Sequence, residues 1–278
     1  MVRYVCGSSK EEINISEGNI RSRIRKAGFY DSDWEPDETK MIIGSAVKKF
    51  GKKAVTYNLT VDFLGNKDIR AENANRFFEM TETDVLNETP GRLYKDDWYI
   101  ECYVIGRESG GRDDRKRAIQ VEEKIYAPYP FWIKETPYYF RKFENISTNN
   151  KRYPGRYSYR YANGMNSGYI INEHFVNTNF KMIIYGPVVN PMVTIGGVPH
   201  LVNIVLEAGE YLIIDSKTKT VIKVTQSGEQ VNAYHNRQKQ RAFFQKIAPG
   251  RQTIMWTGKF DFDIILYTER SEPTWKGR

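Results

Sequence analysis

The amino-acid sequence predicts a mostly β protein with one substantial helix. Three observations lead to this expectation. Most apolar residues alternate with polar ones, one segment has helical periodicity, and the 278 residues are 40% hydrophobic and 14% aromatic. Alternation with period two is typical of strands that bury one face. Aromatic side chains supply much of the buried area of a core, so we expect most of the chain to be folded.

The alternation is clearest at residues 55–63, where every second residue is apolar and those between are polar. This pattern predicts a half-buried strand. Further strands are expected at residues 180–185, 202–206, 211–214, 221–224 and 260–266. The pair Gly196-Gly197 predicts a hairpin turn after a strand at residues 192–195.

Residues 68–86 are the segment with helical spacing of apolar side chains. The apolar residues expected on one helical face are Ile69, Ala74, Phe77, Phe78 and Leu86. Asp68 stands where an N-cap residue would accept a hydrogen bond from the first turn. We therefore expect a helix that turns this face towards the core.

Pro128 and Pro130 predict a boundary between two domains, because proline lacks the amide donor that a central strand needs. A chain of this length fits one large or two modest domains. We expect an N-terminal β domain over residues 1–128, a sandwich or barrel-like fold with the helix near 68–86, and a C-terminal β-sandwich over residues 129–278. Trp275 is expected to pack on that second domain.

The residue types that bind metals or form disulfides are scarce and widely spaced. Cys6 and Cys102 are too few for a disulfide scaffold or a closed zinc site. His174, His200 and His235 lack the spacing of metal ligands, so partly exposed polar side chains are expected there.

Two further patterns are similar to active-site motifs. Residues 44–53 contain glycine and lysine, but the glycine spacing is wrong for a phosphate loop and the segment leads into a strand. Asp261 and Asp263 lie on one face of a predicted strand, where solvent-facing alternation accounts for both. The sequence thus predicts no catalytic, cofactor-binding or metal-binding residues and a protein that is not an enzyme.

Membrane insertion is not expected. No stretch approaches the roughly 18 apolar residues that a membrane-spanning helix requires. Residues 1–6 contain no apolar signal core, so we expect no secretion by that route either.

Basic residues outnumber acidic ones, with 42 Lys and Arg against 34 Asp and Glu and a net charge of +8. They concentrate at residues 21–26, 112–117 and 151–160. Residues 109–117 are polar and rich in glycine, which predicts the tip of a hairpin arm. Its Arg112, Arg115 and Arg117 are candidate contacts to acidic groups of an adjacent subunit or partner.

The third basic segment alternates with tyrosine. Tyr157, Tyr159 and Tyr161 are candidate contacts there, because Tyr and Arg are favoured at protein interfaces. Two alternatives stay open. The rings could stack on sugars, or the segment could bind single-stranded nucleic acid with an affinity that falls steeply with salt. Contact with protein is the preferred interpretation, and nucleic acid is the least favoured.

Several local strings follow one another in a recognisable order. Asp62-Phe-Leu-Gly65 runs into the predicted helix, and Asn190-Pro191 leads to Val193-Thr-Ile-Gly-Gly197. Gly209-Glu-Tyr-Leu-Ile-Ile-Asp215 and Pro249-Gly250 follow, and Arg270-Ser-Glu-Pro-Thr-Trp275 comes after the last strand. In this order, over nearly the whole chain, the sequence resembles the distal tail protein family of long-tailed, siphovirus-type bacteriophages and related tail-like particles.

This resemblance implies a structural adaptor. It implies an N-terminal β domain that assembles into a hexameric ring at the distal end of the tail tube, and a C-terminal galectin-like β-sandwich. The implied partners are further copies of the chain, the tail tube protein, the tail-associated lysin or hub protein, and a receptor-binding protein. The implied location is the tail tip of the virion, after assembly in the host cytoplasm. A carbohydrate-binding module for host cell-surface attachment is the alternative.

Overall fold

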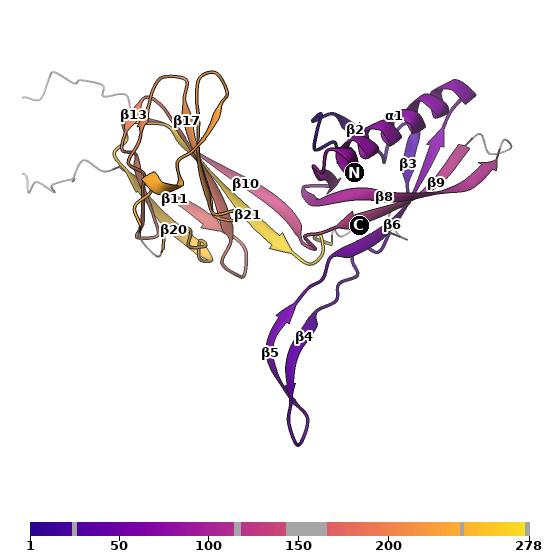
Figure 1. Ribbon diagram of the computed structural model, residues 1–278, viewed down its shortest axis with the longest axis horizontal. Helices are drawn as coiled ribbons and strands as arrows, with labels where there is room; N and C mark the ends of the chain where they lie inside the picture. The colour runs from indigo at the N-terminus through magenta and orange to yellow at the C-terminus, as the bar shows by residue number, and fades with distance from the viewer. Residues whose placement is uncertain (24–26, 114–117, 143–165, 240–241, 276–278) are drawn as a thin grey trace, which may run out of the picture. The chain divides into compact units, whose positions relative to one another are not determined.

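The computed structural model describes residues 1–23, 27–113, 118–142, 166–239 and 242–275 (Figure 1). The chain divides into two compact units, each with a hydrophobic core of its own. Residues 1–134 and 269–278 form the first unit, and residues 135–268 form the second. Strands dominate both units, and the described ranges contain one α-helix, so the predicted mostly β class is confirmed.

The first unit contains two antiparallel sheets that share the long strand β8 (Trp98–Asp113). The sheet strands of this unit are β1 (Val2–Val5), β2 (Glu12–Asn14), β3 (Ile20–Ser22), β6 (Val55–Leu64), β7 (Gly91–Lys95) and β9 (Ala118–Ala127). One sheet runs β2-β1-β7-β8 and the other runs β8-β9-β6-β3. The pairing of β8 with β9 shifts register between Val104 and Gly106. Such bulges bend a strand, which lets β8 pass from one sheet into the other.

A separate two-stranded ribbon belongs to the same unit. It consists of β4 (Glu35–Lys40) and β5 (Ser45–Gly51), which pair with each other. Directly after it, β6 confirms the predicted alternation, because Tyr57, Leu59, Val61 and Phe63 are all at most 3% exposed.

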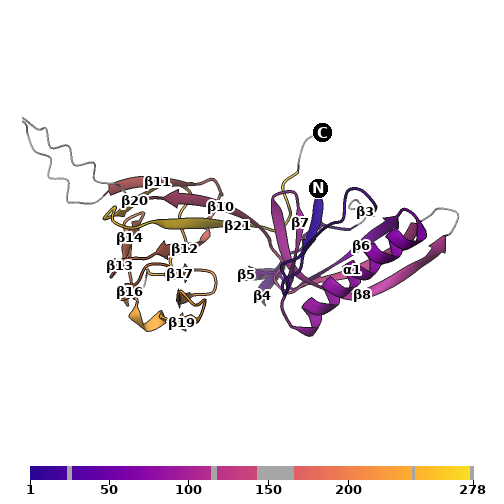
Figure 2. The ribbon, with the colours of Figure 1, turned by 90° about the horizontal axis from the view of Figure 1, so that it is seen from above.

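The helix α1 (Lys67–Leu86) packs against β6, β8 and β9 and lies along them in Figure 2. Its N-cap is Asn66, whose Oδ1 accepts a hydrogen bond from the Ile69 amide at 2.8 Å. The prediction that Asp68 caps the helix is therefore wrong by two residues. Asp68 lies in the first turn instead, where a carboxylate interacts favourably with the helix dipole.

The buried face of α1 also differs from the predicted one. Phe77, Met80, Thr81 and Asp84 are buried, whereas the expected core residues Ile69, Phe78 and Leu86 are 37%, 43% and 76% exposed. The prediction failed because three of the five buried residues of α1, Arg70, Thr81 and Asp84, are polar or charged. A search for apolar residues alone cannot find a face that includes Thr81 and Asp84.

Asp84 fastens the C-terminal end of α1 to the segment that follows β1. Its carboxylate accepts hydrogen bonds from the Tyr4 hydroxyl at 2.7 Å, the Cys6 thiol at 3.1 Å and the amides of Gly7 and Ser8 at 2.9 Å. Burial by itself would raise the pKa of Asp84, but these donors outweigh it and hold the pKa below its ordinary value. Gly91 completes the packing, because a Cβ there would lie 2.0 Å from the Tyr4 hydroxyl oxygen.

The second unit is built from two sheets around one core. One sheet comprises β10 (Trp132–Phe140), β12 (Asn179–Tyr185), β17 (Tyr211–Asp215), β18 (Thr220–Val224), β19 (Gln230–Asn232) and β21 (Phe262–Arg270). The first three residues of β10 and the last two of β21 belong to the first unit, and Trp132 lies in its core. The other comprises β11 (Asn166–Asn172), β14 (Met192–Ile195), β15 (Val198–Leu201) and β20 (Gly250–Trp256). A short pair, β13 (Val188–Val189) with β16 (Val205–Leu206), and the 3-10 helix η2 (Tyr234–Asn236) complete it. Side chains from both sheets meet in a single apolar cluster, as in a β-sandwich.

Turn chemistry in this unit follows the prediction. Gly196 and Gly197 join β14 to β15, and their φ angles of 55° and 86° lie in the left-handed region that glycine tolerates. The strand expected at residues 202–206 is wrong in length. Only Val205 and Leu206 form β16, and Val202 makes an isolated bridge to Arg237.

Trp275 packs elsewhere than expected. Its ring lies 4.1 Å from that of Tyr30, centroid to centroid, and both residues belong to the first unit. The indole is 67% exposed, so it lies on the surface of that unit. The prediction that it packs on the C-terminal sandwich is wrong, because the end of the chain from residue 269 onwards belongs to the first unit.

Candidate assembly surface

The β4–β5 arm projects from the rest of the first unit (Figure 1). Every residue of both strands is exposed, and within the described part of the chain the two strands pair only with each other. A two-stranded ribbon with no core is at best marginally stable in water. The arm therefore has the form of an element that is completed by contact with another molecule.

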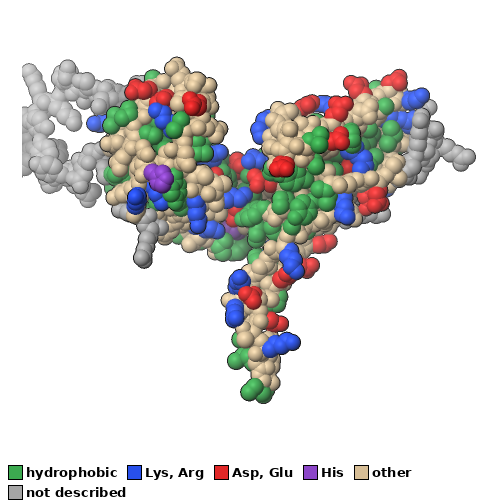
Figure 3. All heavy atoms as spheres, in the orientation of Figure 1, with side chains coloured by type: hydrophobic (Ala, Val, Ile, Leu, Met, Phe, Trp, Pro, Cys, Tyr) green, Lys and Arg blue, Asp and Glu red, His purple; other side chains and the backbone are tan. Residues whose placement is uncertain are grey.

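The tip of the arm is apolar. Met41, Ile42 and Ile43 are 62%, 104% and 92% exposed, and Gly44, with a φ of 75°, closes the turn before β5. Figure 3 shows apolar side chains at the end of the arm and charged side chains along its sides. Three consecutive large apolar side chains in water are a costly arrangement for a free surface, so the tip is a candidate contact site.

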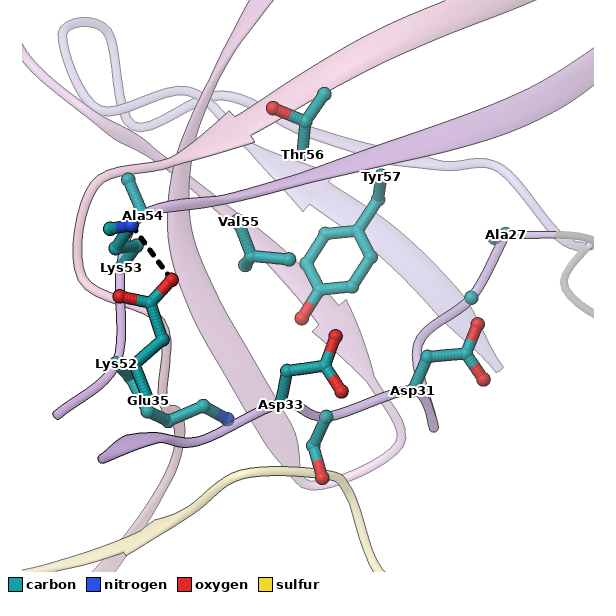
Figure 4. A pocket seen from close by; sticks show the side chains of 12 residues that line it. Ala27, Asp31, Asp33, Glu35, Lys52, Lys53, Ala54, Val55, Thr56 and Tyr57 are labelled. Atoms are coloured by element: carbon teal, nitrogen blue, oxygen red, sulfur yellow. Dashed lines mark ion pairs between the residues drawn. The ribbon is translucent and has the colours of Figure 1, made fainter. Parts of the chain in front are cut away.

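Two ion pairs lie near the root of the arm. Lys53 Nζ lies 2.8 Å from Glu35 Oε1, and Lys49 Nζ lies 3.7 Å from Asp37 Oδ2. The first pair lines a cavity of about 280 Å³ at the root, together with Asp31, Asp33 and Lys52 (Figure 4). Burial lowers the pKa of Lys52. The negative charges of Asp33 and Glu272 act in the opposite direction but do not cancel this shift. Both pairs join the two sides of the arm, but their side chains lie in solvent, where such pairs contribute about 0–1 kcal/mol.

A second open surface lies between α1 and β8. A cavity of about 290 Å³ is lined by apolar and charged side chains of α1, β8 and β9. Phe78, Val85 and Ile105 contribute its exposed apolar surface, at 43%, 39% and 52%. Ile105 is the extra residue of the bulge in β8 and has no partner in β9. We refer to this surface as the α1–β8 groove.

A buried carboxylate lies against the groove. Glu123 of β9 is 0% exposed, and its Oε1 accepts a hydrogen bond from Arg107 Nε at 2.7 Å. The Arg107 guanidinium also lies 4.7 Å from the centre of the Phe78 ring. The other carboxylate oxygen, Oε2, has no hydrogen-bond partner among the described residues. Burial raises the pKa of Glu123, against the opposing charge of Arg107.

Replacing Glu123 with glutamine is expected to stabilise the free chain at pH 7. Because the pKa of Glu123 is raised in the folded state, the folded chain holds this proton more tightly and loses stability as pH rises through the ordinary value of about 4.3. The facing charged groups are Arg107 on β8 and Glu82 on α1. We expect a melting temperature roughly 2 °C higher for Glu123→Gln at pH 7. The difference should vanish below pH 4; an equal shift at pH 3.5 would contradict this account.

The structure places only part of the predicted contact set. Arg112 belongs to β8, where its backbone pairs with Ile119 of β9. Arg115, Arg117, Tyr157, Tyr159 and Tyr161 lie outside the described residues. The β4–β5 arm and the α1–β8 groove were missed by sequence reasoning. The run Met41-Ile42-Ile43 between two charged segments was the available signal for the arm.

Two histidines differ from their prediction. His200 and His174 are 2% and 7% exposed, so they are buried rather than partly exposed. Burial lowers the pKa of His200 to about 4. His235 is exposed. Among the described residues, no group of three or more His, Cys, Asp and Glu side chains could hold a metal ion.

Asp263 likewise is not a solvent-facing residue. It is 7% exposed and accepts hydrogen bonds from Arg141 Nη1 and the Tyr185 hydroxyl, both at 2.7 Å. Asp261 accepts a hydrogen bond from the Lys142 amide at 2.6 Å. Burial and the contact with Asp263 raise the pKa of Tyr185 to about 12. The alternation pattern failed here because the strand face carries a neutralised ion pair instead of water-exposed carboxylates.

The described ranges contain no helix that combines the length and the apolar character needed to cross a membrane. No family model matches the chain, and no curated protein matches its sequence.

Solved structures match the fold over almost the full length. The crystal structure of the SPP1 Dit protein, described as a paradigm of the hub adsorption apparatus in phages that infect Gram-positive hosts, has a TM-score of 0.54 at 9% identity. The match covers 97% of this chain and 99% of that one. A chain of the phage P2 baseplate in its activated conformation with Ca has a TM-score of 0.62 at 9% identity and covers 98% and 100%. The same baseplate with Sr gives a TM-score of 0.60. The chain therefore has the fold of phage hub and baseplate proteins, the fold that the sequence resemblance implied.

Proposed function

We propose that this chain is a structural, non-enzymatic adaptor of a phage tail tip or a related tail-like particle. The observation that carries the proposal is the full-length match of both units to hub and baseplate chains, with 97–100% of each chain covered. Because the match includes both units, it supports a separate role for each. The first unit would form a ring at the distal end of the tail tube, and the second, galectin-like unit would face the receptor-binding apparatus.

Ring formation is supported by the two unlike surfaces of the first unit. A cyclic assembly of identical chains needs head-to-tail contacts, in which one surface of each copy meets a different surface of the next. The β4–β5 arm and the α1–β8 groove are two such surfaces on one unit. In this proposal the ring joins the tail tube protein to the tail-associated lysin or hub protein, and the assembled protein is located in the virion tail.

The test is the mass and shape of the purified chain. Light scattering should give about six times the chain mass of 32.5 kDa at high protein concentration, and negative-stain images should show closed rings. Addition of tube protein should raise the ring fraction if the tube acts as a template. A chain that stays monomeric with and without tube protein would overturn the proposal.

Arg112, Arg115 and Arg117 stay a prediction within this proposal. Changing all three to alanine is expected to weaken ring assembly or tube docking, because charge complementarity sets register and association rate between subunits. The measurement is the ring fraction at low and at moderate salt. If the triple variant assembles and docks as the parent does, these arginines are not contacts.

A further inference from the structure

The α1–β8 groove is incomplete in the isolated chain. Glu123 is fully buried, yet its Oε2 has no hydrogen-bond partner among the described residues. A buried polar atom without a partner destabilises the fold, and it does so more strongly when it is charged. Beside it, Phe78 and Ile105 keep about half of their surface in water, at 43% and 52%. A ligand that fits this site brings an apolar surface and one hydrogen-bond donor, preferably a cation.

The tip of the β4–β5 arm carries that combination. Met41, Ile42 and Ile43 supply exposed apolar surface, and Lys40 precedes them as the last residue of β4. Lys40 has no ion-pair partner among the described residues, in contrast to Lys49 and Lys53 nearer the root. The arm has a reach of about 20 Å, since six strand residues rise by about 3.3 Å each.

We propose that the arm tip of one copy docks in the α1–β8 groove of a second copy, with Lys40 Nζ bound to Glu123 Oε2. This inference rests on the proposed function, because it names the contact by which copies join. The apolar tip covers Phe78, Val85 and Ile105, and the lysine gives the buried carboxylate its second partner. The occupant is a second copy because the two surfaces match in both apolar character and charge. Contact between two different surfaces can also repeat around a ring.

Cysteine cross-linking tests the contact directly. The double variant Ile43→Cys with Ile105→Cys should form disulfides between copies under mild oxidation and give a ladder on a non-reducing gel. The matched control is Ile43→Cys with Glu72→Cys, because Glu72 is exposed on α1 but does not line the groove. The native Cys6 and Cys102 are 1% and 0% exposed and should not contribute.

Single variants give an independent readout. Lys40→Ala and Glu123→Gln should each raise the dissociation constant for self-association about tenfold or more, because each leaves one member of a buried pair alone. Lys48→Ala, a change to a neighbouring exposed lysine of β5, should change it less than about twofold. Glu123→Gln should do this while its melting temperature stays at or above that of the parent, which separates lost contact from lost folding.

The outcomes distinguish this inference from the proposed function. Rings that form without the Ile43–Ile105 cross-link, and that tolerate Lys40→Ala, would overturn the arm-to-groove contact and leave the ring intact. A parent chain that forms no rings, together with a double-cysteine variant that forms no cross-links, would overturn both. If Lys40→Ala and Glu123→Gln weaken binding of added tube protein but leave self-association unchanged, the groove belongs to the tube and the second copy is overturned as occupant.

Discussion

Replacing Asp84 with alanine is expected to destabilise the first unit by about 3–5 kcal/mol, because each buried donor left without an acceptor costs roughly 1–3 kcal/mol, while the burial cost of the carboxylate is recovered. The Asp84 carboxylate is the shared acceptor for the Tyr4 hydroxyl, the Cys6 thiol and the amides of Gly7 and Ser8. With alanine there, these buried donors lose their acceptor together. The measurement is urea unfolding of the whole chain, with separate spectroscopic probes in the two units.

Two controls make the Asp84 result interpretable. Asp62→Ala removes a carboxylate whose partner Arg23 is half-exposed, and such a surface pair contributes about 0–1 kcal/mol. A full-sized loss in that variant would contradict the assignment. The second unit has a core of its own, so its transition should stay where it is in the parent.

The same network predicts a defined response to acid. The pKa of Asp84 is lowered in the folded state, so the folded chain binds this proton less tightly than the unfolded chain. The stabilisation is therefore complete above the ordinary aspartate value of about 3.9 and is lost as pH falls through the folded pKa. An Asp84→Asn variant should lack this acid-dependent part of the stability curve.

Replacing Trp132 with alanine is the second large effect, with an expected loss of about 3–5 kcal/mol. Trp132 is 0% exposed at the start of β10 and is the largest of the fully buried side chains. Its ring lies 5.3 Å from that of Phe29 and 6.3 Å from that of Tyr57, centroid to centroid. Alanine would remove an indole from the centre of this aromatic group and leave a cavity that close-packed neighbours fill only in part.

Trp132→Phe is the matched variant for this position. It keeps an aromatic ring against Phe29 and Tyr57, so it should cost clearly less than alanine. Thermal unfolding followed by near-ultraviolet circular dichroism is a suitable measurement, since the signal of this aromatic group disappears with its packing. Equal losses for alanine and phenylalanine would show that cavity volume is not what sets the cost.

Elements with one buried face and one solvent-exposed face could be predicted from the sequence. The strand β6 is an example, because alternation reports directly which side chains are buried. The β14–β15 hairpin is another, because Gly196 and Gly197 both adopt positive φ angles. In both cases the physical cause is local, so the local sequence is enough to predict the outcome.

The parts that sequence reasoning missed depend on contacts distant in the chain. Asp84 is buried because Tyr4, some 80 residues earlier, donates to it, and no pattern within α1 records that partner. The β4–β5 arm buries neither face, so its strands carry no alternation to detect. The α1–β8 groove forms from residues of three elements and from a bulge at Ile105, and no sequence pattern predicts that bulge.

The positions of the two cysteines allow the opening of the first unit to be measured by thiol labelling. Cys6 and Cys102 are the chain's two cysteines, both are free and buried, and both lie in the first unit. Burial raises the pKa of Cys102 to about 12, which further suppresses the reactive thiolate. A thiol reagent therefore modifies these side chains only when the first unit opens, and the second unit contributes no background. Mass spectrometry of the labelled chain would then time the opening of one unit, even in a mixture where optical signals from other proteins overlap.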